Sequence, residues 1–365
     1  MKLAMLGTLF IFALLLACTS PDQPPNPGNT TTPPPVSNNS TGTVNDSNGG
    51  TGTGGGITIP PEINTTQPGN NSTGTSGSGQ NTTIDLVNER ILGQKLIFAQ
   101  TPSSPLEAYI YNIGIGQAIL IRKGDFNMLI DTGKPESANQ VVANLRYSGI
   151  ERIDVLALTN NKPEHAGGLS EVLNSFSISE IWTNNVQPAG DAKDAYDKYI
   201  TGRIPVKHPW QGDSVKLNGI KLTVLNPPNS TMFVGEDVNS IVLKIEDRGT
   251  CMMVMSDVTS SIEDRFISNN MNLTCNLLVL GNHGSGLSSD LLFIEKVFPD
   301  WNQPAAKRKP ELALISAGTE EANYPNSAVL ERLRLKHIPY VSTTTNGTLK
   351  VVIDSVGYNV ITMAG

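Results

Sequence analysis

The chain has 365 residues, of which 38% are apolar, and a formal net charge of −7. This length is sufficient for at least one large domain with its own hydrophobic core. The acidic balance argues against a surface built to bind a nucleic-acid backbone, which requires clustered positive charge. We therefore interpret the short basic run A-K-R-K at 306–309 as a solvated loop.

The first 18 residues resemble a lipoprotein-type signal peptide. Lys2 precedes an apolar run that is too short for an ordinary membrane span, and this run ends in L-L-A-C at Cys18. The resemblance implies cleavage before Cys18 and lipidation of its thiol. The chain would then be exported to the cell surface and anchored to the outer face of the cytoplasmic membrane. A plain secretory signal, in which Cys18 is incidental, is the alternative.

Residues 19–83 consist mainly of Asn, Thr, Pro, Gly and Ser, with few charges and few large apolar side chains. Such a segment cannot bury enough apolar surface to offset the entropy lost on ordering, so we predict a disordered stalk. N-x-S/T sequons are dense in it, and further ones follow, at Asn29, Asn38, Asn39, Asn45, Asn64, Asn70, Asn71, Asn81, Asn229, Asn272 and Asn346. Their density beside an export signal favours a glycosylated surface stalk.

Residues 84–365 are predicted to form one domain in which strands and helices are interspersed. Strands are expected at 108–113, 118–122, 126–131, 153–158 and 178–183, with helices at 137–147, after 168 and near 191–199. Strands are also expected at 221–225, 239–246, 251–257, 276–280, 311–316 and near 340, 349 and 360, with helices at 260–268, 291–297 and 327–334. Two β-rich halves of this kind predict two mixed sheets that lie face to face with helices outside.

Polar residues gather at the ends of four predicted strands. They are Asp131, the loop T-N-N-K-P-E-H-A-G-G at 159–168, Asp257, and the pair Asn282 and His283. Because strand ends in layered α/β folds can meet at one edge, we expect these four clusters to converge on one crevice. The two cysteines of this region, Cys251 and Cys275, form either a disulfide or two buried thiols.

The order of these motifs resembles that of the metallo-β-lactamase superfamily, and in particular the hydrolase-like domain of ComEC-type DNA-uptake proteins. The motifs are F-N-M-L-I-D-T-G at 126–133, R-I-D-V-L-A-L-T at 152–159, H-A-G-G at 165–168, S-D at 256–257 and G-N-H-G-S at 281–285. The resemblance extends over about 109–347. It implies a four-layered αββα sandwich, a centre of two metal ions that activates water, and DNA as one partner to consider.

The metal-binding positions of the family are only partly kept. Asn160 and Lys162 stand where the family has its first two loop histidines, and Gln117 stands at an early acid. An amide is a poor ligand for a transition ion compared with imidazole, and an ammonium has no lone pair to donate. Asn282 replaces the first residue of a late histidine pair. The resemblance therefore indicates that the first metal site is lost.

Four candidate ligands of a second metal site survive. They are Glu164, which stands at the family's aspartate, His165, Asp257 and His283. These residues could hold one divalent ion, zinc or manganese, if His283 rather than Asn282 takes the family's late ligand position, and both alignments stay open. In that case Glu164 and Asp257 would be the catalytic residues. In the metal-free alternative, Asp257 and His283 form an ordinary buried hydrogen-bonded pair.

Two functions follow from these observations. In the first, the chain is a surface-anchored metallo-β-lactamase-fold protein with a degenerate site, no metal and little or no hydrolase activity, and it binds an unknown ligand or surface partner. In the second, it is a single-metal extracellular hydrolase of the phosphodiesterase or nuclease type. The position of Lys162 separates them. An ammonium among the acids would act as a salt-bridged plug, whereas a lysine pointing away would favour one bound ion.

Overall fold

The computed structural model describes residues 86–91, 94–99, 104–186, 190–197, 203–229, 235–319 and 323–363. All of them belong to the second of the two units into which the chain divides, Ser78–Gly365. The signal peptide expected at 1–18, with Cys18, and the stalk expected at 19–83 lie outside the described residues. No helix in the described part of the chain is both long enough and apolar enough to cross a membrane.

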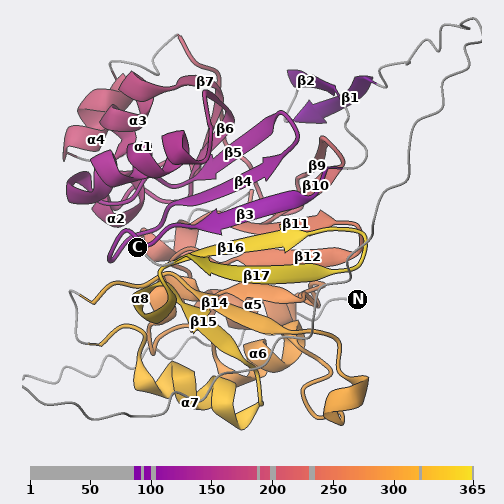
Figure 1. Ribbon diagram of the computed structural model, residues 1–365. Helices are drawn as coiled ribbons and strands as arrows, with labels where there is room; N and C mark the ends of the chain where they lie inside the picture. The colour runs from indigo at the N-terminus through magenta and orange to yellow at the C-terminus, as the bar shows by residue number, and fades with distance from the viewer. Residues whose placement is uncertain are drawn as a thin grey trace, which may run out of the picture. The chain divides into compact units, whose positions relative to one another are not determined.

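Two mixed β-sheets form the centre of the described domain (Figure 1). The first sheet has the strand order β17-β16-β3-β4-β5-β6-β7-β8, and the second has the order β15-β14-β13-β12-β11-β10-β9. Strands β5 to β8 pair in parallel, and so do strands β12 to β15. The other neighbours pair antiparallel. The parallel strands place their carboxyl ends at a common edge of each sheet.

The strands of the first sheet are β3 (Leu106–Ile110), β4 (Ile119–Lys123), β5 (Phe126–Ile130), β6 (Arg152–Leu158), β7 (Ser177–Thr183), β8 (Val206–Lys207), β16 (Thr348–Ile353) and β17 (Tyr358–Met363). Those of the second sheet are β9 (Ser214–Leu217), β10 (Ile220–Asn226), β11 (Val242–Asp247), β12 (Thr250–Val254), β13 (Leu277–Val279), β14 (Leu312–Ile315) and β15 (Tyr340–Ser342). Strands β1 (Leu86–Ile91) and β2 (Gln94–Ala99) form a separate antiparallel pair.

Helices cover the outer face of each sheet (Figure 1). The first sheet carries α1 (Ala138–Tyr147), α3 (Leu169–Ser175) and α4 (Gly190–Ala195), and the second carries α5 (Ser260–Ser268), α6 (Leu291–Val297) and α7 (Ser327–Leu335). Two single turns, α2 (Pro163–Ala166) and α8 (Thr343–Asn346), follow β6 and β15. The 3-10 turns are η1 (Pro135–Ser137), η3 (Asp237–Asn239), η4 (Gly281–Gly284) and η5 (Ala305–Lys307).

Three apolar cores hold these layers together. One lies between the sheets and includes Phe126 and Trp182. A second lies between the second sheet and helices α5 to α7, and a third between the first sheet and its helices. Strand β5 is buried at every residue because it is covered on both faces, and four of its five residues are apolar. The predicted four-layered αββα sandwich is therefore confirmed.

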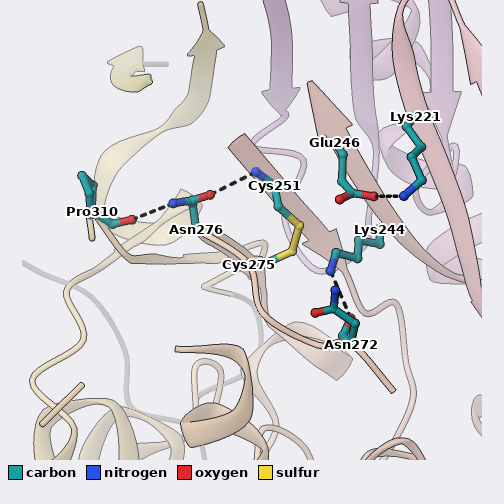
Figure 2. The surroundings of a disulfide bond; sticks show 8 residues. All are labelled: Lys221, Lys244, Glu246, Cys251, Asn272, Cys275, Asn276 and Pro310. Atoms are coloured by element: carbon teal, nitrogen blue, oxygen red, sulfur yellow. Dashed lines mark hydrogen bonds and ion pairs between the residues drawn. A yellow bond between two sulfur atoms is a disulfide. The ribbon is translucent and has the colours of Figure 1, made fainter. Parts of the chain in front are cut away.

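Cys251 in β12 and Cys275 just before β13 are joined by a disulfide bond (Figure 2). Their Cα atoms lie 4.8 Å apart, and both side chains are buried. Of the two alternatives that the sequence left open, the structure contains the bonded pair. The bond fixes the amino-terminal ends of two neighbouring parallel strands, at the edge of the sheet opposite to their carboxyl ends.

Candidate functional site

The four predicted polar clusters meet at the carboxyl ends of parallel strands. Because these ends lie at one edge of each sheet, residues far apart in sequence become neighbours. The site is built from Asp131 after β5, the loop 159–162 between β6 and α2, Ser256 and Asp257 after β12, His283 in η4 after β13, and Ser316 after β14. The packing of the two sheets thus brings together the clusters of both halves of the domain.

His165 lies fully buried between two carboxylates. Its Nδ1 donates a hydrogen bond to Oδ2 of Asp131 at 2.7 Å, and its Nε2 lies 2.9 Å from Oδ1 of Asp257. Asp131 also accepts hydrogen bonds from the backbone N–H and the hydroxyl of Thr159, each at 2.7 Å. Gln117, at the position of a family acid, donates its amide to the same carboxylate at 2.7 Å. Asp131 therefore fixes the loop and orients His165.

Lys162 lies among three carboxylates. Its Nζ is 3.1 Å from Oδ2 of Asp257 and 3.8 Å from Oε1 of Glu164, and it also forms an ion pair with Asp237. Asp257 is buried, whereas about a quarter of the Lys162 side chain is exposed. The positive charge therefore closes the outer side of the cluster. This is the arrangement expected of a salt-bridged plug.

His283 faces the cluster from the second sheet. Asn282 and His283 both have left-handed backbone angles, with φ of 48° and 54°, and this turn directs the imidazole inward. The Nδ1 of His283 donates to the carbonyl of Ser316 at 3.0 Å, so the lone pair of the neutral ring resides on Nε2. That Nε2 lies 3.8 Å from Oδ1 of Asp257. His283, and not Asn282, thus contributes the inward nitrogen.

Electrostatics divide the site into charged and neutral members. Burial disfavours the imidazolium of His165, but Asp257 and Asp131 outweigh burial and raise its pKa to about 10. Burial also opposes the charge of Asp257, yet His165 and Lys162 outweigh burial and lower the pKa of this carboxyl. Burial disfavours the ammonium of Lys162, but Asp257 and Asp237 outweigh burial and raise its pKa. Burial lowers the pKa of His283, which is therefore neutral at pH 7.

The residues present do not fit a pair of metal ions. Asn160 donates its amide to the hydroxyl of Ser240 at 3.2 Å, and its Oδ1 accepts from the N–H of Lys162 at 3.0 Å. Both ends of the Asn160 amide are therefore occupied by hydrogen bonds that hold the loop in place. Lys162 places a cation 3.1 Å from the buried carboxylate of Asp257. A second cation at this carboxylate would be repelled by the ammonium.

Three of the four predicted ligands fit a single ion better. One nitrogen or oxygen atom from each of His165, Asp257 and His283 lies within 4.8 Å of the others. In the described part of the chain, Nε2 of His165, Oδ1 of Asp257 and Nε2 of His283 have no well-aligned hydrogen bond. Two imidazoles and a carboxylate are a donor set that divalent zinc, manganese or iron accepts. Glu164 is not part of this group, and its carboxylate lies beside Lys162 instead.

Asp237 and Ser316 were missed by the sequence analysis. Asp237 lies in η3, in the connection between β10 and β11, and pairs with Lys162. Ser316 follows β14, and only its backbone carbonyl acts on the site, by orienting His283. Every residue has a backbone carbonyl, so no sequence pattern marks the one that orients His283. An aspartate in a loop between two antiparallel strands carries no pattern that assigns it to a site in another part of the chain.

The layered fold, with a polar loop at the carboxyl ends of its parallel strands, is that of a metallo-β-lactamase-type domain. Residues 111–243 match the family model described as metallo-beta-lactamase superfamily. Members of this superfamily usually bind divalent metal ions. The match covers the loop with Lys162 and His165, and it ends at the start of β11, before Asp257.

The chain is also similar to competence proteins. It is 25% identical over 252 residues to competence protein ComA of Neisseria gonorrhoeae and 23% identical over 274 residues to ComE operon protein 3 of Bacillus subtilis. It is 24% identical over 263 residues to recombination protein 2 of Haemophilus influenzae. The alignments cover 68%, 68% and 70% of this chain but 32%, 33% and 30% of the relatives. The chain thus spans about a third of the length of these relatives.

Solved structures to which the chain is similar include the metallo-β-lactamase fold protein YhfI from Bacillus subtilis, at 13% identity and a TM-score of 0.43. That alignment covers 68% of this chain and 100% of YhfI. Rm3 metallo-beta-lactamase aligns at 16% identity with a TM-score of 0.35, over 47% of this chain and 77% of its own.

Proposed function

We propose that this protein is a metallo-β-lactamase-fold domain whose two-metal hydrolytic centre is replaced by an ion-pair network, and that it binds a ligand or partner at the crevice instead of hydrolysing it. We also propose that it acts at the cell surface, anchored through lipidated Cys18 and a stalk. The signal-like residues 1–18 and the disulfide Cys251–Cys275 support export, because structural disulfides are typical of proteins outside the cytoplasm.

The observation that carries this proposal is the ammonium of Lys162 between Asp257, Asp237 and Glu164. In an active two-metal site, cations neutralise these carboxylates and polarise a water molecule. Lysine can supply the neutralising charge, but it has no lone pair with which to hold an ion, and it offers no open coordination position. The network therefore replaces the structural role of the metal ions without their chemistry.

The net charge of the crevice determines which charge on a ligand is favoured. Lys162 and His165 are positive, whereas Asp131, Asp257, Asp237 and Glu164 are negative. The cluster is therefore negative overall, as is the whole chain at −7. Although the competence relatives make DNA the first ligand to test, a negative crevice repels a phosphate backbone. A neutral or cationic ligand, such as a basic peptide segment, fits it better.

The test is to purify the exported chain without chelators and measure its metal content and hydrolysis of bis-nitrophenyl phosphate and single-stranded DNA. We expect fewer than one tightly held ion per two chains and no hydrolysis above the background with zinc, manganese or magnesium. Two tightly held ions per chain would overturn the proposal. A fluorescence anisotropy titration with single-stranded DNA at low salt should likewise detect no tight binding.

A second candidate function rests on three atoms of His165, Asp257 and His283 that converge without a well-aligned hydrogen bond. In this candidate these residues hold one divalent ion, which would supply an activated water for phosphodiester hydrolysis. Here His165 keeps its Nδ1 on Asp131, and His283 keeps its Nδ1 on Ser316, so that both Nε2 atoms stay directed inward. Asp257 would still pair with Lys162 through its other oxygen.

The two candidates differ in a measurement that does not depend on activity. One bound ion per chain, lost in both His165→Ala and His283→Ala but kept in the surface variant His337→Ala, would establish the single-ion site. Metal-dependent cleavage that disappears in Asp257→Asn would then assign the reaction to it. Equal, low metal content in all of these proteins would exclude this candidate and leave the binding function.

A further inference from the structure

Three sequons begin within the described part of the domain, at Asn229, Asn272 and Asn346. A sequon is an acceptor for an N-linked glycan only if its asparagine amide and its Ser or Thr hydroxyl can both be reached. By this criterion the structure distinguishes Asn272 from Asn346. The residues that complete the sequon at Asn229 lie outside the described residues, and we assign nothing to it.

Asn272 offers both groups. It lies with Leu273 and Thr274 in a segment of irregular backbone between α5 and β13. The Asn272 and Thr274 side chains are exposed, and Asn272 accepts the hydrogen bond of Lys244 through its backbone carbonyl, not its amide. Leu273 between them is buried in the core under the second sheet. The apolar side chain thus anchors the segment, while the two polar side chains point outward.

A firm base holds this segment in place (Figure 2). The backbone carbonyl of Asn272 accepts a hydrogen bond from Nζ of Lys244 at 3.0 Å, and Cys275 is bonded to Cys251. Asn272 and Thr274 also line a hollow of about 310 Å³ beside the disulfide. Because the backbone is fixed and the side chains are free, a sugar on Asn272 requires no change in the fold.

Asn346 is constrained at both ends of its sequon. Its side-chain carbonyl accepts hydrogen bonds from the N–H of Ser342 at 3.1 Å and the hydroxyl of Thr345 at 2.9 Å. The hydroxyl that completes its sequon, on Thr348, accepts from the N–H of Asn112 at 3.1 Å. Thr348 is moreover the first residue of β16, a strand paired on both sides. Transfer to Asn346 would require this strand end to be released.

A glycan on Asn272 would leave the crevice open. The sequon lies beside Cys251 and Cys275, at the amino-terminal ends of β12 and β13, whereas Asp257 and His283 follow the carboxyl ends of these strands. The extended residues from Cys251 to Val254 alone span about 10 Å, and the turn with Asp257 follows them. The sugar would therefore cover the disulfide edge of the second sheet, away from Lys162 and its acids.

We propose that Asn272 carries an N-linked glycan in the exported protein, and that Asn346 does not. The donor is a lipid-linked oligosaccharide phosphate. A bond forms between Nδ2 of Asn272 and C1 of the first sugar, while the bond from C1 to the phosphate oxygen breaks. The lipid phosphate leaves with its electron pair, and one proton of the amide passes to a base of the transferase. The disulfide Cys251–Cys275 fits the oxidising compartment in which this transfer occurs.

The experiment is peptide mass mapping of the full chain, purified from the cells that naturally produce it. We expect a glycan mass increment on the peptide with Asn272 in the wild type, in Asn346→Gln and in Thr274→Ser, which keeps the sequon. The increment should be lost in Thr274→Ala, in which Asn272 itself is unchanged. Circular dichroism and thermal melting of Thr274→Ala confirm that the variant is folded, since Thr274 is exposed.

Two results would overturn the proposal. One is an unmodified Asn272 peptide in the wild-type protein. The other is an increment that persists in Thr274→Ala, because it would not depend on the sequon. An increment on the Asn346 peptide would contradict the second half of the proposal and show that release of β16 precedes transfer.

Discussion

The ammonium of Lys162 lies 3.1 Å from Oδ2 of Asp257, and the other oxygen of this carboxylate lies 2.9 Å from Nε2 of His165. One buried aspartate is thus shared by two cations that come from a single loop. Here both of its oxygens are already in contact with positive protein groups, and this arrangement joins the loop of the first sheet to the second sheet.

Removal of the Lys162 charge should destabilise the domain. Lys162→Met leaves Asp257 and Asp237 close together without their shared cation, and breaking such a pair is costly when the remaining charge is buried. Because the lysine is a quarter exposed, we expect a loss of roughly 1–3 kcal/mol in the free energy of unfolding. Guanidinium unfolding at pH 7 measures it.

A matched control is Lys221→Met, which removes an exposed lysine paired with Glu246 at 2.9 Å. It should change the unfolding free energy by less than about 0.5 kcal/mol. The double variant Lys162→Met/Asp257→Asn should regain part of the lost stability, since the uncompensated carboxylate is gone. Equal effects of the two lysine variants would show that the network does not stabilise the fold.

A histidine at position 162 should increase metal affinity. Lys162→His replaces a repelling ammonium by an imidazole, next to His165, Asp257 and His283, which already converge. We expect zinc to bind at least about tenfold more tightly than to the wild type, as followed by titration calorimetry. Lys162→Met, which removes the charge without adding a ligand, serves as the control. If both variants gain the same affinity, loss of repulsion alone is responsible.

The stability of the second sheet should depend on pH through Glu263. Burial raises the pKa of this carboxyl from its ordinary value of 4.5 to about 7, although it accepts hydrogen bonds from the backbone N–H groups of Ser289 and Asp290. The folded state therefore binds a proton more tightly than the unfolded state. The resulting stability is fully present below about pH 4.5 and is lost as the pH rises to about 7.

The difference in pKa corresponds to roughly 3 kcal/mol. Unfolding free energies of the wild type and of Glu263→Gln, measured at intervals from pH 4.5 to 7.5, test this. The wild type should lose stability relative to the variant across that window, because glutamine does not titrate. Parallel curves would mean that the pKa of Glu263 is not raised in the folded protein.

The glycine pair after His165 should be intolerant of side chains. A Cβ at Gly168 would lie 2.3 Å from the carbonyl oxygen of Thr132, although its backbone is otherwise suited to alanine. We expect Gly168→Ala to lower the unfolding free energy by about 1–3 kcal/mol through overpacking. Gly149→Ala, where nothing lies within 4 Å but φ is +73°, should cost about 1 kcal/mol. A larger effect at Gly149 would contradict this steric argument.

Much of the fold follows from local sequence patterns. The mainly apolar runs of β5 and β6 predict strands covered on both faces, and the structure buries nearly every residue of both. Glycines and polar turns separate the strands where expected. Strand ends were predicted less closely, as at 239–246, where the strand begins only at Val242. Asn239 is instead the last residue of η3, which places Asp237 beside Lys162.

The sequence by itself determined the order of strands and helices and the side chains of the loop at 159–168, because periodicity and side-chain identity are local properties. An asparagine at 160 and a lysine at 162 cannot act as histidines in any conformation. Only the tertiary structure decided which carboxylates form ion pairs with the ammonium of Lys162. Asp257 is 95 residues from Lys162, and Asp237 comes from a different loop. Their meeting depends on the packing of two sheets, and no local pattern encodes a contact across that interface.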